Sequence, residues 1–176
     1  MISVKLIFLS FLGSCITFAQ NPIDHIDSLI KDQRPILFAK LANDKYVKVI
    51  NEKWPEKVDE SINLFTYHGK VRLIKIMPFS ESGDWFYEVD NYFSDAGELV
   101  AYIEIKNHFN SICLDEAIHR TKIFIKVGAK FRLIKSTIQD SKGNDVSKLK
   151  CEDPYDFKPD LISNLKIYLQ KLGFNK

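Results

Sequence analysis

The chain has 176 residues, of which 45% are hydrophobic and 13 are phenylalanine, so it is long enough to bury the core of one domain. Its 25 basic and 23 acidic residues leave a formal net charge of +2 at pH 7. A chain so close to neutrality has no overall attraction to nucleic acid or to an anionic membrane, and we expect no nucleic-acid partner.

Residues 1–19 form a predicted secretory signal peptide. Lys5 supplies a positive charge, an apolar run follows, and Thr17 and Ala19 suit the −3 and −1 positions of a cleavage site. Residues 6–19 are too few to cross a hydrocarbon core, which takes about 20. We therefore expect cleavage after Ala19, export to the periplasm or the medium, and a mature domain over residues 20–176 without a transmembrane helix.

Cys15 leaves a second interpretation of the signal open. Residues 12–15, Leu-Gly-Ser-Cys, fit a lipoprotein box in which Cys15 would be acylated and would become the anchored N-terminus. Ile16 and Phe18 continue the apolar run, whereas a lipid-anchored chain usually turns polar at once. Cleavage after Ala19 is therefore the preferred interpretation.

The mature chain begins with a predicted helix. Asn21 is a favoured N-cap, Pro22 suits the first helical position, and three isoleucines recur at helical spacing. Pro35 prevents the helix from continuing. Beyond it, residues 46–50 are a candidate strand and residues 55–61 a candidate short polar helix.

From residue 62 onward, apolar and polar residues alternate, which predicts strands. The predicted strands cover residues 62–67, 71–79, 84–93, 98–107, 117–127 and 130–139. Their short connections require antiparallel neighbours, and a last helix is predicted from Asp160 to Gly173. The predicted fold is a single α+β domain with a curved, mainly antiparallel sheet of six or seven strands and a helix near each end. This layout is similar to that of helix-grip and cystatin-like folds, with no motif that assigns a family.

Hydrophobic patterning also predicts how the last hairpin pairs. A two-residue loop would pair Val127 with Lys130 and mix charged with apolar side chains on both faces. A three-residue loop would pair Lys126 with Lys130 and place Ile125 opposite Phe131. It would also gather four basic residues on the other face: Lys122, Lys126, Lys130 and Arg132. We predict the three-residue loop, because it separates core from solvent.

Charge is segregated along the chain. Seven acidic residues and no basic one lie between Ile76 and Ile105, whereas six basic residues and no acidic one lie between Ala117 and Gln139. The simpler interpretation is that the two hairpins adjoin and that opposite charges meet across strands. The alternative is that the basic hairpin binds an anionic envelope component or another protein. The candidate binding residues are then the four basic residues of the last hairpin.

Aromatic side chains are the other candidates for a binding surface. Phe86, Tyr92 and Tyr102 are expected together on the charged face of the preceding hairpin, where exposed aromatics can anchor a partner. The alternative is that a helix or loop covers them. Glu88 and Glu104 would face each other across strands, as in a glycosidase, although a nearby lysine would account for the pair without catalysis.

Two cysteines, Cys113 and Cys151, remain after removal of the signal. In an oxidising compartment two thiols of a small domain most simply form a disulfide. A reactive thiol beside His108 or His119 is the alternative, but a Cys–His pair cannot be recognised from proximity in sequence.

No cofactor or metal motif is recognisable, and we expect neither. The four histidines lack ligand spacing, Glu116 and His119 fall in a predicted strand, and residues 140–145 resemble a calcium loop only in composition. No catalytic motif occurs either.

The predicted function is therefore that of an exported, non-enzymatic binding or interaction domain of the cell envelope. One alternative is a carrier whose curved sheet encloses an apolar ligand among residues such as Trp85, Tyr87 and Phe131. The other is a hydrolase that depends on a carboxylate pair.

Overall fold

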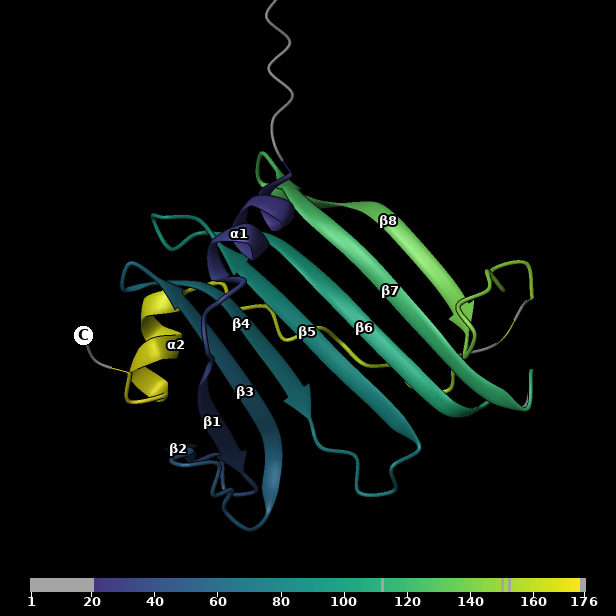
Figure 1. Ribbon diagram of the computed structural model, residues 1–176, viewed down its shortest axis with the longest axis horizontal. Helices are drawn as coiled ribbons and strands as arrows, with labels where there is room; N and C mark the ends of the chain where they lie inside the picture. The colour runs from purple at the N-terminus through teal and green to yellow at the C-terminus, as the bar shows by residue number, and fades with distance from the viewer. Residues whose placement is uncertain (1–20, 112, 150, 152, 175–176) are drawn as a thin grey trace, which may run out of the picture.

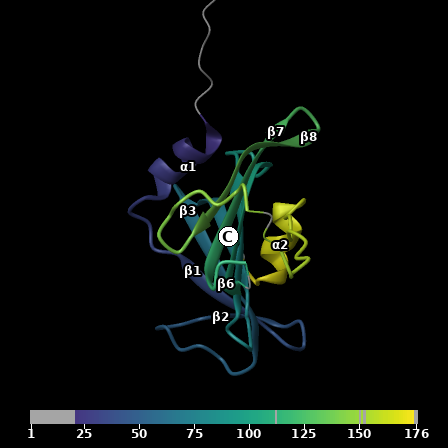
Figure 2. The same ribbon diagram turned by 90° about the vertical axis from the view of Figure 1, so that its right-hand side faces the viewer.

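The computed structural model is an eight-stranded antiparallel sheet with one helix on each face (Figures 1 and 2). It describes residues 21–111, 113–149, 151 and 153–174, so the predicted signal peptide, its cleavage site and Cys15 lie outside the described residues. The elements are α1 (Pro22–Ile30), β1 (Ile36–Leu41), β2 (Tyr46–Lys48), β3 (Val58–Tyr67), β4 (Lys70–Pro78), β5 (Trp85–Phe93), β6 (Leu99–Ser111), β7 (Glu116–Val127), β8 (Lys130–Asp140) and α2 (Leu165–Lys171). The α+β fold class is confirmed, with slightly more strands than predicted.

The strand order is β2-β1-β3-β4-β5-β6-β7-β8, and β3 to β8 form the predicted meander. The additional strand, β1, lies between β2 and β3, with Phe38 opposite Ile62. The predicted polar helix at residues 55–61 is wrong. Lys57 has a φ of 57°, which breaks a right-handed helix, and the chain from Val58 onward pairs with β1 instead.

Both faces of the sheet carry a hydrophobic core. On the first, here called the α1 face, the isoleucines of α1 pack over a patch of the central strands: Leu73, Tyr92 and Ala101. On the opposite face, α2 and the segment before it cover a second group that includes Phe38, Ile62, Ile74 and Phe93. Seen edge-on in Figure 2, α1 and α2 lie on opposite sides of the sheet.

The segment before α2, residues 153–162, crosses the sheet as an extended strap, and its face is here called the strap face. The buried side chain of Asn91 holds the end of this strap. Its Oδ1 accepts from the backbone N of Ile162 at 3.1 Å, and its Nδ2 donates to the carbonyl of Asp160 at 3.4 Å. The predicted start of the last helix at Asp160 is therefore wrong. The helix begins after Asn164, whose side chain accepts from the backbone N of Ile167 as an N-cap.

Bulges near one end of the sheet set the register of the hairpins. Arg72 in β4, Val100 in β6 and Ile134 in β8 are each an extra residue with no opposite partner in the adjoining strand. The predicted three-residue loop of the last hairpin is wrong, because Val127 pairs with Lys130. Both faces of this hairpin are partly covered by other elements, so separating core from solvent was the wrong criterion for its register.

Candidate binding site on the α1 face

The structure divides the four basic residues of the last hairpin between two faces. The register places Lys122 and Lys126 on the strap face and Lys130 and Arg132 on the α1 face. All four are exposed, but they do not share the single surface that the sequence predicted. The two charged hairpins do adjoin, and Glu104 lies opposite Lys122.

The predicted aromatic surface is divided in the same way. Phe86 and Tyr92 lie on the α1 face, where α1 buries Tyr92. Tyr102 is buried on the strap face, where its ring stacks on Phe124 with centroids 4.4 Å apart. The extra residue in β6 moves the polar positions of β5 and β6 to opposite faces.

The same bulge separates the two glutamates of the hypothetical glycosidase pair. Glu88 lies opposite Ile105, and Glu104 lies opposite Val89. Residues directly opposite in an antiparallel pair share a face, whereas successive residues alternate, so the two carboxylates point to opposite faces of the sheet. This predicted pairing is wrong.

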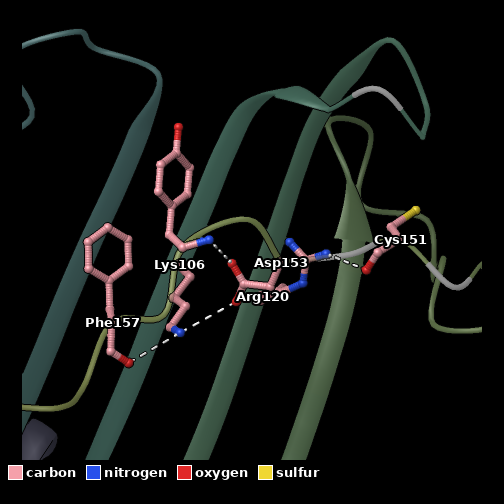
Figure 3. A network of polar contacts seen from close by, with 6 residues as sticks. Lys106, Arg120, Cys151, Asp153 and Phe157 are labelled. Carbon is pink, nitrogen blue, oxygen red and sulfur yellow. Dashed lines mark hydrogen bonds and ion pairs between the residues drawn. The ribbon is translucent and has the colours of Figure 1, made fainter.

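The disulfide between Cys113 and Cys151 is present and fixes the start of the strap. Figure 3 shows the polar contacts that follow. The Arg120 guanidinium donates to the carbonyl of Cys151 at 3.0 Å, and Lys106 Nζ lies 3.4 Å from Asp153 and 3.5 Å from the carbonyl of Phe157. These contacts hold the strap against β6 and β7.

The strap also closes the strap face with aromatic rings. Phe157 stacks on Tyr87 with centroids 4.8 Å apart and lies 4.6 Å from the ring of Trp85. Tyr87, expected to line a ligand cavity, is therefore covered by the chain itself.

An apolar groove opens instead on the α1 face, beyond the end of α1. Its volume is about 520 Å³. We call it the aromatic groove and define it by five of its lining residues: Trp54, Met77, Phe79, Phe86 and Phe109. Trp85 borders the groove, but its ring packs on Phe157 of the strap, on the other face of the sheet. Helix α1 packs at the opposite end of the same strands and leaves this end uncovered (Figure 1).

The groove exposes large apolar side chains to solvent. Phe79 is 63% exposed, Trp54 45% and Phe109 41%. Of the residues predicted for a binding surface, only Phe86 lines this groove, and Trp85, which was expected in a ligand cavity, borders it. The sequence did carry a signal for the others, because Trp54 and Phe79 stand in polar loops where a core residue is not expected.

A buried charged group lies between α1 and the aromatic groove. Lys75 of β4 points to the α1 face, with Nζ 2.9 Å from Glu88 Oε1 and 2.8 Å from Asp90 Oδ2. We call these three residues the Lys75 cluster. The acidic residues of β5 are thus paired with a lysine of β4 rather than with the basic hairpin.

Burial dominates the protonation of the Lys75 cluster. Asp90 is only 3% exposed, and burial raises its pKa to about 7 although Lys75 opposes the shift. Burial lowers the pKa of Lys75, but the charge and hydrogen bonds of Asp90 and Glu88 outweigh that effect and the net pKa is raised. On α1, burial also raises the pKa of Asp27, which is hydrogen-bonded to Tyr92. The lysine is therefore charged at neutral pH, while Asp90 is poised to gain or lose a proton.

A second groove, of about 1070 Å³, lies beside α2 on the strap face. Phe131, another residue expected in a ligand cavity, lines it together with charged residues such as Asp95 and Lys126. Asp95 forms an ion pair with the buried guanidinium of Arg72. The lining of this groove is more polar than that of the aromatic groove.

Within the described residues, no three His, Cys, Asp or Glu side chains gather as metal ligands. Neither helix in the described part of the chain has the length and hydrophobicity to cross a bilayer. No family model matches the chain, and no curated protein or solved structure shows significant similarity to it.

Proposed function

We propose that this chain is an exported binding domain and that the aromatic groove takes a small apolar ligand. The observation that carries the proposal is the groove itself, an apolar hollow of about 520 Å³ with exposed aromatic side chains. Small-molecule sites span about 300–1000 Å³ and are lined mainly by apolar and aromatic groups. Exposed apolar surface of this kind is unfavourable in water unless something binds there.

Export is supported by the predicted signal peptide and by the disulfide. Cys113 and Cys151 are joined, and structural disulfides form and persist in oxidising compartments. The part of the chain that follows Ala19 would then reach the periplasm or the medium as a folded domain. Acylation of Cys15 is the alternative that would tether the same domain to a membrane.

Intrinsic fluorescence provides a direct test of the groove. The chain has two tryptophans: Trp54 lines the groove, whereas the ring of Trp85 packs on Phe157 of the strap. An occupant of the groove therefore alters the emission of Trp54. The purified protein is titrated with 1-octanol while tryptophan emission is recorded. We expect a saturable change in intensity and wavelength that follows a single binding isotherm.

A matched pair of variants locates the binding. Phe109→Ser removes a groove side chain that is 41% exposed, and Leu133→Ser removes one that is 48% exposed on β8, outside the groove. We expect the first variant to weaken octanol binding at least about tenfold, from a loss of roughly 1.5 kcal/mol of apolar contact, and the second to leave it unchanged. Equal effects of the two variants, or no saturable change in wild type, would contradict the proposal.

A further inference from the structure

We propose that the ligand of the aromatic groove carries a cationic head group with N–H donors, such as a primary ammonium, which binds at Glu88 and Asp90. The inference rests on the proposed function of the groove and adds the chemical class of the ligand. Four observations support it: the position of the Lys75 cluster beside the groove, its excess of carboxylates over lysine, the buried acceptor atoms without a partner, and the raised pKa of Asp90.

The Lys75 cluster continues the line of the groove. Side chains at every second position of a strand share a face, so Phe86 of the groove is followed on the α1 face by Glu88 and then by Asp90. On β4, Met77 of the groove is followed by Lys75 in the same way. A ligand seated against Phe86 therefore reaches Glu88 by extending about 7 Å along the sheet.

The charges of the cluster do not balance when all its groups are ionised. One ammonium, that of Lys75, serves two carboxylates, whose side chains are only 11% exposed in Glu88 and 4% in Asp90. Asp27, on α1 above the cluster, adds another acidic group, and the Tyr92 hydroxyl beside it is neutral at pH 7. A buried excess of negative charge is costly, and it favours a cation over a neutral or anionic head group.

Two hydrogen-bond acceptors on this face have no partner among the residues that the structure describes. They are Oδ1 of Asp90 and Oδ1 of Asn107, and both atoms are buried. Asn107 lies opposite Phe86, so it stands diagonally beside Glu88. Buried acceptors need donors, and a primary ammonium has three N–H donors and no acceptor.

Without a ligand and below about pH 7, a proton on Asp90 offsets the excess negative charge. Burial raises the pKa of Asp90 to about 7, and a protonated Asp90 is able to donate to Glu88. An ammonium that binds beside both carboxylates would displace this proton. Binding of a cationic ligand near neutral pH should therefore release a proton to the buffer, whereas binding of an alcohol should not.

Three ligands with the same apolar tail test the inference on the wild-type protein. Octylammonium, 1-octanol and octanoate are titrated at pH 6.5, below the pKa of Asp90, with tryptophan emission as the readout, and proton release is measured by calorimetry in buffers of different ionisation enthalpy. We expect octylammonium to bind at least about tenfold more tightly than 1-octanol, and octanoate to bind most weakly.

Variants separate the head-group site from the groove. Glu88→Gln and Asp90→Asn should reduce octylammonium affinity to that of 1-octanol and leave 1-octanol binding unchanged. Asp156→Asn is the matched control, because Asp156 is exposed on the strap, on the other face of the sheet. Circular dichroism confirms that each variant is folded, and the comparison of the three ligands on wild type does not depend on the variants.

The outcomes distinguish the inference from the proposed function. If 1-octanol binds and octylammonium binds no more tightly, the inference is overturned and the proposed function stands. If none of the three ligands binds, the proposed function fails and the inference fails with it. A tenfold preference for octylammonium that survives both Glu88→Gln and Asp90→Asn also overturns the inference.

Discussion

Replacement of Asn91 by alanine should release the end of the strap and lower the free energy of unfolding. Asn91 is fully buried, and its amide satisfies the backbone N of Ile162 and the carbonyl of Asp160. In Asn91→Ala the carbonyl of Asp160 is near enough to solvent to be hydrated, but the N–H of Ile162 stays buried without an acceptor. Such a group costs about 1–3 kcal/mol, and the lost side-chain volume adds to it, so we expect a loss of about 3 kcal/mol.

Urea unfolding followed by tryptophan emission measures this loss as a shift of the midpoint at constant slope. Asn164→Ala is the control, because it removes an exposed N-cap of α2 and should cost about 1 kcal/mol. Asn91→Asp keeps the acceptor for Ile162 but buries a carboxyl, so its loss should be smaller at acidic pH, where the protonated group is able to donate to the carbonyl of Asp160. If Asn91→Ala costs no more than Asn164→Ala, the side chain of Asn91 does not hold the strap.

Three further predictions concern stability. Burial raises the pKa of Asp90 from 3.8 to about 7, so the protonated carboxyl favours the folded state. The free energy of unfolding should therefore fall by up to about 4 kcal/mol between pH 4 and pH 8. Urea titrations across that range measure this decline, and Asp90→Asn should remove most of it. Ellman titration of the denatured mature protein should find no free thiol, and two titratable thiols would disprove the disulfide. Joint replacement of Cys113 and Cys151 by serine should lower the free energy of unfolding by about 4 kcal/mol. Ile26→Ala should lower the free energy of unfolding by about 3 kcal/mol in the same urea assay, because Ile26 of α1 is 2% exposed and packs in the same core cluster as Leu73. A loss below about 1 kcal/mol would show that α1 is not firmly packed.

The sequence predicted the elements better than their pairing. Alternation of apolar and polar residues located β3 to β8, and the N-cap and isoleucine spacing located α1. Residues 36–41 escaped notice because the run ILFAKL shows no clear alternation of apolar and polar side chains. The strap lacks any periodic pattern, because its backbone is held by side chains such as that of Asn91 rather than by a ladder.

The candidate site depended on register, which the sequence did not determine. A single extra residue moves every later side chain to the other face, and the bulges at Val100 and Ile134 have no marker in the sequence. The expectation that apolar side chains gather on one face also failed, because both faces of this sheet are covered in part. Phe86 was recognised as a binding residue, whereas its neighbours in the groove come from loops and strand ends far apart in the chain.

The bulge at Ile134 also bears on how the protein behaves at high concentration. An open sheet has two edges, and the longer one here, β8, presents its outer backbone groups over residues 130–137, whereas residues 138–140 pair with residues 144–146. Such an edge is a template on which a second chain can add a strand, leading to fibres or amorphous precipitate. The bulge interrupts the regular spacing of that template, and the exposed Lys130, Arg132 and Lys135 repel an identical strand. The other edge, β2, offers only Tyr46–Lys48. The basic residues of β8 would therefore oppose polymerisation of the molecule through its own sheet, a role that needs no ligand.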